Sequence, residues 1–412
     1  MKKIVAIALA LVLAFAMTAC NSAPTAPAAD PAAPAADPAA PAADPAAETT
    51  EVVANSTDPI IIGVYGPLSG DSAMVGKTLL EGVELATKQI NEAGGIYGRQ
   101  ISLITEDDAQ DPATAVSAVN KLIYSDKVEA IIGTVNSSCT LASMEVSQAA
   151  GIPHVTPISS GAAVTLLGNP YIVRLQASDL LQAGGIAEYA ITQLGAKKIA
   201  CLYQSDDYGT GAMEVIVETL KSHGMELVAN EAFDAKSLDM TPQLLKVKEA
   251  GADALIMYTM YQQGALIADQ ARQMGIECPL MGGGGLTNAK LYELGGEAVI
   301  GLVNTQTFFA NADAVNQVSA DFIAAFEAEY SKIPDSNNAM SFDSMLTLAE
   351  GLKYSIEKTG DIDGDLVMEG MKAIKDMDMA TGTITIDENG DSLRAEILKV
   401  RLIGDKQYEL VK

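Results

Sequence analysis

Ile60-Ile61-Ile62-Gly63-Val64 is a continuous apolar run that opens a regular pattern along the chain. A run without polar residues is typical of a strand whose two faces are both buried, as in a parallel sheet. The stretch from residue 60 to residue 90 therefore predicts a strand followed by a helix with one buried face. That face carries apolar residues at the 3.6-residue period, namely Leu79, Val83, Ala86 and Ile90.

The same alternation continues along the next forty residues. Ile101–Ile104 and Ala130–Ile132 are two further strand-like segments. Between them, Asp111-Pro112 supplies a helix cap followed by a proline at the first helical position. Strands that alternate with helices at this spacing indicate a parallel sheet covered by helices on both faces.

A second part of the chain repeats this pattern at an offset of 124 residues. Val128–Ile132 resembles Ala252–Ile256, and Gly151-Ile152 resembles Gly275-Ile276. We therefore expect an α/β protein with two doubly wound parallel-sheet lobes. Two such lobes leave a ligand cleft beyond the carboxyl ends of their strands.

The end of the chain departs from the alternation. Helical periodicity covers Val315–Ser331, Ala339–Lys358 and Leu366–Lys375. Thr383–Ile386 and Ile397–Val400 then predict two late strands, which we expect to form a hairpin.

Composition excludes several functions. The chain has 412 residues, enough for two or three domains, and its 26 basic and 53 acidic residues give a net charge of −27. Nucleic-acid binding is not expected, because phosphate contacts need clustered Lys and Arg. With two histidines and no metal-ligand spacing, the sequence predicts no metal site and no cofactor.

The first residues predict a secretion signal. Lys2 and Lys3 precede the apolar segment Ile4–Ala16, which is shorter than a membrane-spanning helix. Met17–Cys20 resembles a bacterial lipobox, which implies a signal peptide at residues 1–19 and a lipid on Cys20. The alternative is an ordinary signal peptide with an incidental cysteine.

Residues 20–58 are rich in Ala, Pro and Asp, with repeats of Pro-Ala-Ala-Asp. Such a segment cannot bury a core and favours an extended spacer. We therefore expect a lipid-anchored linker that holds an extracytoplasmic body at the membrane, at the cell surface or in the periplasm.

Enzyme signatures are not found. No Gly-x-Gly-x-x-Gly follows the first strand, and the chain has no phosphate-binding loop, nucleophile elbow or His-Glu-x-x-His. His154 lies in an apolar strand and His223 at a helix end, which favours structural roles. We expect no enzymatic activity.

Small hydroxyl residues follow several predicted strands. Asn136–Thr140 opens a helix, Thr156–Gly161 includes Ser159 and Ser160, and Ser205–Gly209 follows a strand of the second repeat. Hydroxyls and free N–H groups at a helix start suit a carboxylate. Helix capping is the simpler interpretation of each loop alone; three such loops around one cleft favour a small-molecule receptor.

Six short motifs are distributed along the body of the chain: Gly66–Gly70, Ile90–Ile96, Asp107–Pro112, Arg174–Asp179, Asp207–Gly209 and Gln270–Gly275. Together they resemble motifs of the solute-binding proteins of branched-chain amino-acid ABC transporters, the leucine/isoleucine/valine-binding group with the type I periplasmic-binding fold. The resemblance covers Pro59 to Lys412 and implies a non-catalytic receptor for a small, branched-chain-type amino acid.

The resemblance also implies site residues. A ligand carboxylate would be held by Ser137 and by Ser160, and the backbone carbonyl of Ile158 would face the ligand ammonium. Tyr208 would close over the ligand from the second lobe. An acid at the lobe crossover matches Asp179.

At three further positions this sequence agrees less well with the family's pattern. A second aromatic of the family falls at Met260-Tyr261, and we favour Tyr261. Gly284 stands where the family has a Glu that holds the ammonium, and Val75 replaces an aromatic. Either Asp179 supplies the charge, because an unpaired buried cation is costly, or the ligand is not a plain α-amino acid. Both changes also leave room for a larger side chain.

The family's three-strand hinge implies lobe boundaries. We place the crossovers near Ser178, Thr307 and Asp387, so the first lobe comprises 59–178 and 308–387, and the second 179–307 and 388–412. Lobe closure around the ligand would present a monomeric receptor to ABC permease subunits. The alternatives are a receptor for an amide, urea or aromatic acid, a sensory lipoprotein, an α/β enzyme, or a structural envelope lipoprotein.

Overall fold

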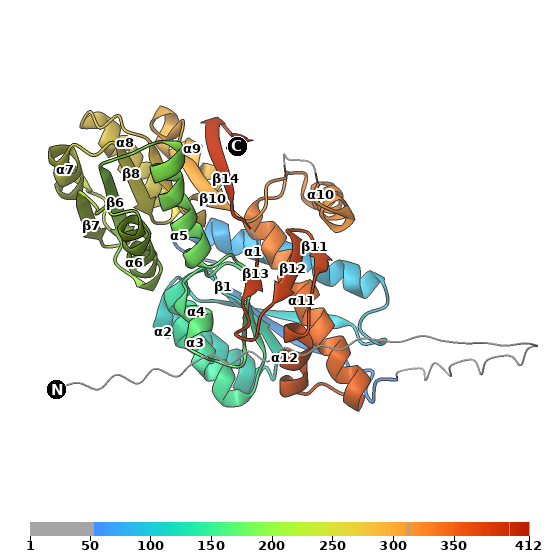
Figure 1. Cartoon of the computed structure of the whole chain (residues 1–412). Helices are drawn as coiled ribbons and strands as arrows, with labels where there is room; N and C mark the ends of the chain where they lie inside the picture. Colours follow the sequence, from blue (N-terminus) through green and yellow to red (C-terminus); the bar gives the residue numbers. More distant parts are fainter. Residues whose placement is uncertain (1–52, 311–313, 395, 412) are drawn as a thin grey trace, which may run out of the picture. The chain divides into compact units, whose positions relative to one another are not determined.

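The computed structural model describes residues 53–310, 314–394 and 396–411. The expected signal peptide at 1–19, the lipidation site Cys20 and nearly all of the linker lie outside the described residues. Figure 1 shows the elements of the body, which belong to two α/β lobes and a small additional sheet.

The first sheet is parallel throughout, with the strand order β2-β1-β3-β4-β5. This is a doubly wound order, which reverses direction between β1 and β3 and opens a crevice there. The expected strand–helix alternation is confirmed. The strands are β1 (Ile60–Gly66), β2 (Ile101–Asp107), β3 (Ala130–Ile132), β4 (His154–Thr156) and β5 (Ile172–Arg174).

Both faces of strand β1 are buried, which explains its continuous apolar sequence. Ile60, Ile62 and Val64 belong to the cluster that includes residues of α1 (Ala73–Glu92) and α11 (Ser336–Thr359). Tyr65 points to the opposite face, into a separate cluster with α2 (Pro112–Asn120) and α3 (Ser137–Ala150). Because successive side chains alternate in direction, both faces of the strand must be apolar.

The second sheet repeats the first. Its parallel part has the order β7-β6-β8-β9-β10, so β8 occupies the same place as β3, as the 124-residue repeat predicted. Two antiparallel strands extend its β10 edge. The strands are β6 (Ile199–Gln204), β7 (Ala229–Phe233), β8 (Ala254–Tyr258), β9 (Leu280–Gly282), β10 (Val303–Gln306), β14 (Leu398–Gly404) and β15 (Gln407–Leu410).

The remaining helices cover the sheets and connect the lobes. α5 packs on α6, α7 packs on α8, and α11 packs on both α1 and α12. The α-helices not yet given are α4 (Ala163–Leu166), α5 (Asp179–Glu188), α6 (Asp207–Ser222), α7 (Thr241–Ala250), α8 (Tyr261–Gln273), α9 (Lys290–Gly295), α10 (Gln317–Tyr330) and α12 (Gly364–Lys372). Two π turns, η1 (Lys121–Ser125) and η2 (Tyr189–Gln193), and two 3₁₀ turns, η3 (Gly284–Leu286) and η4 (Gly296–Val299), complete the set.

The small sheet corrects two expectations. It contains β11 (Met377–Met379), β12 (Gly382–Ile386) and β13 (Ser392–Leu393), and β12 forms its hairpin with β13. The expected partner strand, β14, pairs with β10 instead. Asp391 also bridges to β5, so the chain stays beside the first lobe through Leu393. The third crossover therefore follows Leu393 and not Asp387.

Arg174 ties this hairpin to the first lobe. Its guanidinium is fully buried and donates to both carboxylate oxygens of Asp391, with Nε to Oδ1 at 3.1 Å and Nη2 to Oδ2 at 2.5 Å. Nη1 donates to the carbonyls of Ser160, at 3.0 Å, and Gly161, at 2.6 Å. The planar guanidinium can satisfy all these acceptors at once.

Replacing Arg174 with an uncharged residue should destabilise the folded protein. We expect Arg174→Met to lower the free energy of unfolding by roughly 3 kcal/mol, because Asp391 and two buried carbonyls lose their donor. Chemical denaturation of the ligand-free protein measures the change. Arg401→Met, at a half-exposed pair with Glu409, is the control and should cost less than about 1 kcal/mol. Equal losses in the two variants would contradict this role.

Candidate functional site

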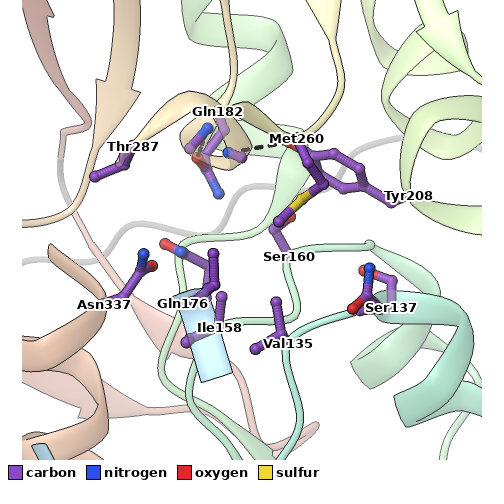
Figure 2. A pocket seen from close by; sticks show the side chains of 14 residues that line it. Val135, Ser137, Ile158, Ser160, Gln176, Gln182, Tyr208, Met260, Thr287 and Asn337 are labelled. Carbon is purple, nitrogen blue, oxygen red and sulfur yellow. Dashed lines mark hydrogen bonds between the residues drawn. The ribbon is translucent and has the colours of Figure 1, made fainter. Parts of the chain in front are cut away.

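The segments that follow the strands of both lobes line one cavity (Figure 2). The space measures about 430 Å³ when the volume open to solvent is included. First-lobe segments follow β1, β3, β4 and β5, and second-lobe segments follow β6, β8 and β9. The lining residues are Val75, Val135, Asn136, Ser137, Ile158, Ser160, Gln176, Gln182, Tyr208, Met260, Gly284, Gly285, Thr287 and Asn337.

The start of helix α3 forms one wall of the cavity. Its first intrahelical bond joins the Thr140 N–H to the Asn136 carbonyl at 3.0 Å, so the preceding N–H groups of the helix have no carbonyl of their own turn. Asn136 makes no side-chain cap. The Ser137 hydroxyl accepts from the Gly161 N–H at 3.1 Å, and its own proton is free for another acceptor. Such a helix start favours an anion.

The loop after β4 brings only part of the predicted set to the cavity. Ile158 and Ser160 line it, as expected, but Ser159 does not. The Ser159 hydroxyl turns into the protein, where it bonds Thr140 Oγ1 at 2.6 Å and donates to the Val135 carbonyl at 3.2 Å. Neighbouring residues of an extended loop point in opposite directions, which explains the difference.

Asp179 lies behind the cavity surface at the first residue of α5. Its side chain is fully buried, and Oδ1 accepts from the Tyr258 hydroxyl at 2.5 Å. Oδ2 has no hydrogen-bond partner among the described residues. Burial raises the pKa of Asp179 to about 6, against the effects of the Tyr258 and Ser160 hydroxyls and the Arg174 guanidinium. One oxygen of this buried carboxylate therefore has no hydrogen bond among the described residues to replace the water that it loses on burial.

Of the two aromatic residues predicted for the site, Tyr208 lines the cavity and Tyr261 does not. Tyr208 lines the cavity, and its hydroxyl accepts from the Gly285 N–H at 3.2 Å. Tyr261 does not line the cavity; Met260 does. The Tyr261 hydroxyl instead donates to the carbonyl of Asp71 at 3.4 Å, joined there by the side-chain amide of Gln262. Both contacts join the second lobe to the first.

Gly284 lines the cavity but leaves less room than expected. A side chain there would begin 2.8 Å from Oε1 of Gln182. That oxygen accepts the Gly284 N–H at 3.0 Å and the Thr305 hydroxyl at 3.0 Å. Gln182 thus occupies part of the space beside the glycine. Val75 lines the cavity too.

Sequence reasoning missed four polar residues of the cavity: Gln176, Gln182, Thr287 and Asn337. One signal was available, because Gln182 follows Asp179 by three residues and so shares its helix face. Asn337 sits in the first turn of a helix whose position against the cavity only the fold defines. No sequence pattern marks it.

Two other kinds of site are not seen in the described ranges. No group of three or more His, Cys, Asp or Glu side chains there could hold a metal ion. Nor does any helix in this part of the chain combine the length and the apolarity that a membrane crossing requires.

The profile of the periplasmic binding protein family matches residues 59–402. The chain therefore belongs to this family, whose members act as solute-binding receptors of ABC transporters and have the type I periplasmic-binding fold.

Individual proteins similar to this chain are named as binding proteins for branched-chain amino acids. The Leu/Ile/Val-binding protein homolog 3 of Brucella melitensis is 30% identical over 335 residues, 81% of this chain and 88% of the relative. A leucine-, isoleucine-, valine-, threonine-, and alanine-binding protein of Pseudomonas aeruginosa is 28% identical, with 81% and 87% covered. The crystal structure of leucine binding protein LivK from Thermotoga maritima matches with a TM-score of 0.80 at 28% identity. That match covers 86% of this chain and 98% of the other.

The buried charge of Asp179 should cost stability in the ligand-free protein. Because its pKa in the folded state, about 6, lies above the ordinary 3.8, folding penalises the ionised form. The penalty is absent below about pH 4, grows between pH 4 and 6, and is complete above pH 6. We expect Asp179→Asn to raise the free energy of unfolding at pH 7 by about 1–3 kcal/mol, and to change it little at pH 4.

Denaturant titrations of the ligand-free protein at the two pH values measure this effect. Asp405→Asn, at an exposed turn, is the control and should change neither value. A gain from Asp179→Asn that is the same at both pH values would contradict the pKa assignment.

Proposed function

We propose that this protein is an extracytoplasmic receptor that captures a small amino acid in the cavity and delivers it to an ABC importer. One observation carries the proposal: the cavity offers an uncapped helix start on one side and a buried, incompletely paired carboxylate behind its wall. A zwitterion presents the two opposite charges that these features complement. The Pseudomonas and Thermotoga relatives are named for amino acids that they bind, and the Brucella relative is named as a homolog of a Leu/Ile/Val-binding protein.

The proposed pose follows from the contacts. The ligand carboxylate accepts from the hydroxyls of Ser137 and Ser160 and from the N–H groups at the start of α3. The ammonium lies toward Asp179 and the carbonyl of Ile158. Tyr208 covers the ligand from the second lobe. In this pose Asp179 replaces the acid that is missing at Gly284.

Delivery depends on a change of shape, not on chemistry at the cavity. Ligand contacts from both lobes favour the closed form, because only that form makes them all at once. The closed receptor docks on permease subunits, and partner subunits hydrolyse ATP. We propose no catalytic role for any residue of this chain.

The amino-terminal region completes the proposal. Residues 1–19 direct secretion and are removed, Cys20 carries the lipid, and residues 20–58 space the body from the membrane. The receptor acts as a monomer held by its lipid alone.

Amides, urea and aromatic acids are the competing ligands, together with a sensory role for the same fold. The unpaired oxygen of Asp179 argues against an aromatic acid, because such a ligand brings no cation to a buried charge. The same atom favours any ligand with an ammonium group.

A thermal-shift screen tests the function. The protein is unfolded and refolded to remove bound ligand, then heated with each of the twenty amino acids, their amides, urea and several aromatic acids. A ligand at 100 times its Kd should add about 2.7 kcal/mol and raise the Tm by a few degrees. We expect α-amino acids to give this shift. Shifts with non-amino ligands alone, or with nothing, would contradict the proposal.

Single hydroxyl deletions test the pose. Ser137→Ala and Ser160→Ala should each weaken amino-acid binding by about 1–3 kcal/mol, because a ligand carboxylate oxygen loses a donor. Titration calorimetry measures the change. Ser159→Ala is the matched control: it removes a neighbouring hydroxyl that points away from the cavity, and binding should be unchanged. Unaltered affinity in both test variants would refute the site assignment.

A further inference from the structure

One side of the cavity is formed by four uncharged polar side chains, which we call the hinge-side cluster: Gln176, Gln182, Thr287 and Asn337. In Figure 2, Gln176 and Asn337 lie across the pocket from Ser137 and Tyr208. The cluster is therefore separate from the groups that receive the ligand carboxylate. The proposed function assigns no partner to it.

Hydrogen bonds tie the first two members, Gln176 and Gln182, to the backbone of the same residue, Ala177. Oε1 of Gln176 accepts from the Thr307 hydroxyl at 2.5 Å and from the Ala177 N–H at 3.0 Å. Nε2 of Gln182 donates to the carbonyl of Ala177 at 2.7 Å. Both glutamines are thus fixed to the segment where the chain first leaves the first lobe.

The other two members are fixed to the same region. Thr287 accepts from Nδ2 of Asn304 at 2.8 Å, and the next residue of that strand, Thr305, donates to Gln182. Ser336, the neighbour of Asn337, accepts the Thr307 N–H at 3.2 Å. The cluster therefore sits on the two crossovers near Ser178 and Thr307, at the hinge.

Each of three members keeps hydrogen-bonding capacity that the described residues do not use. Gln176 has bonds only to Oε1, which leaves Nε2 free, and Thr287 accepts a bond but donates none. Asn337 is 4% exposed, and its carboxamide bonds to no described residue. Donors and an acceptor thus face one small space.

The cavity offers no charge to a ligand side chain. None of the fourteen lining residues is acidic, basic or a histidine. Asp179 behind the wall is matched by the α-ammonium in the proposed pose, so a charged ligand side chain would be buried here without a counter-ion, which is strongly unfavourable. An aliphatic side chain would instead remove water from the free carboxamide and hydroxyl groups and return no hydrogen bond.

We infer that the ligand is an α-amino acid whose side chain ends in a hydroxyl or a carboxamide, the group that pairs with the hinge-side cluster. This rests on the proposed function and narrows its ligand class. Sites that bond a ligand's polar group discriminate strongly against the analogue that lacks it. We therefore expect at least tenfold selectivity over an aliphatic side chain of the same shape.

Two pairs of amino acids of matched shape test the inference by titration calorimetry on the full, ligand-stripped protein. Threonine is compared with valine, and asparagine with leucine. The expected result is that at least one polar member binds ten times more tightly than its aliphatic partner. Valine and leucine binding as well as or better than their partners overturns the inference and leaves the proposed function standing. If no amino acid binds, the inference and the proposed function are both overturned.

A variant identifies the cluster as the cause. Asn337→Leu removes a carboxamide without breaking any side-chain bond to a described residue, so the ligand-free Tm should be retained. Its selectivity for the polar ligand over the aliphatic partner should fall at least tenfold. Gln273→Leu removes an exposed carboxamide on α8 that is not among the lining residues and should keep the selectivity. Equal selectivity in Asn337→Leu and the unaltered protein overturns the assignment.

Discussion

Asp179 is buried at the point where the chain passes from the first lobe to the second. Groups of both lobes, the Arg174 guanidinium and the Tyr258 hydroxyl, offset part of the cost of burying its charge. Its backbone N–H donates to the Ser160 carbonyl at 2.8 Å, and its carboxylate accepts from Tyr258 of the second sheet. The Arg174 guanidinium, bonded to that same Ser160 carbonyl, partly offsets the effect of burial on its pKa. This arrangement joins a first-lobe loop, a crossover and a second-lobe strand around one atom, Oδ2, that has no hydrogen-bond partner among the described residues. Burial of this charge therefore costs stability.

The repeated topology makes this possible. In a parallel sheet every strand ends on the same edge, so each lobe delivers several loops to one line. Two sheets with the same strand order set two such lines against each other, which is why thirteen of the fourteen lining residues follow one of seven strands; Asn337, in the first turn of α11, is the exception. The two sides of the cavity differ: the start of α3 carries N–H groups that have no carbonyl of their own turn, and the opposite side carries the carboxamides of Gln176 and Asn337. Arg174, at the end of β5, also helps to fix these loops, because it pairs with Asp391 and donates to the carbonyls of the loop after β4.

Sequence patterns predicted the parts of this fold that depend on local periodicity. The alternation around Ile60–Val64 and the 124-residue repeat predicted the strands, helices and lobes. Loop chemistry indicated residues 136–140 and 156–161, and the family resemblance selected Ser137 and Ser160 within them. The hairpin of residues 382–393 was paired incorrectly, because β14 is a better strand by composition than the two-residue β13, and the choice of partner is a tertiary one. Met260 was passed over for Tyr261 because only the helix start defines which of two neighbours turns inward. Asn337 carries no local signal at all.

Tyr261 and Gln262 both reach the Asp71 carbonyl from the opposite lobe, and neither contact involves a ligand. These contacts stabilise the arrangement of the two lobes seen in this structure, whether or not the cavity is filled; in the proposed function this arrangement is the closed form. A receptor built this way needs less binding energy to shift its population to the closed form, and its apparent affinity is reduced less by the open state. The same contacts must break before the ligand leaves, so they lengthen its residence time. Retention between encounters with a transporter thus depends partly on residues that never touch the cargo.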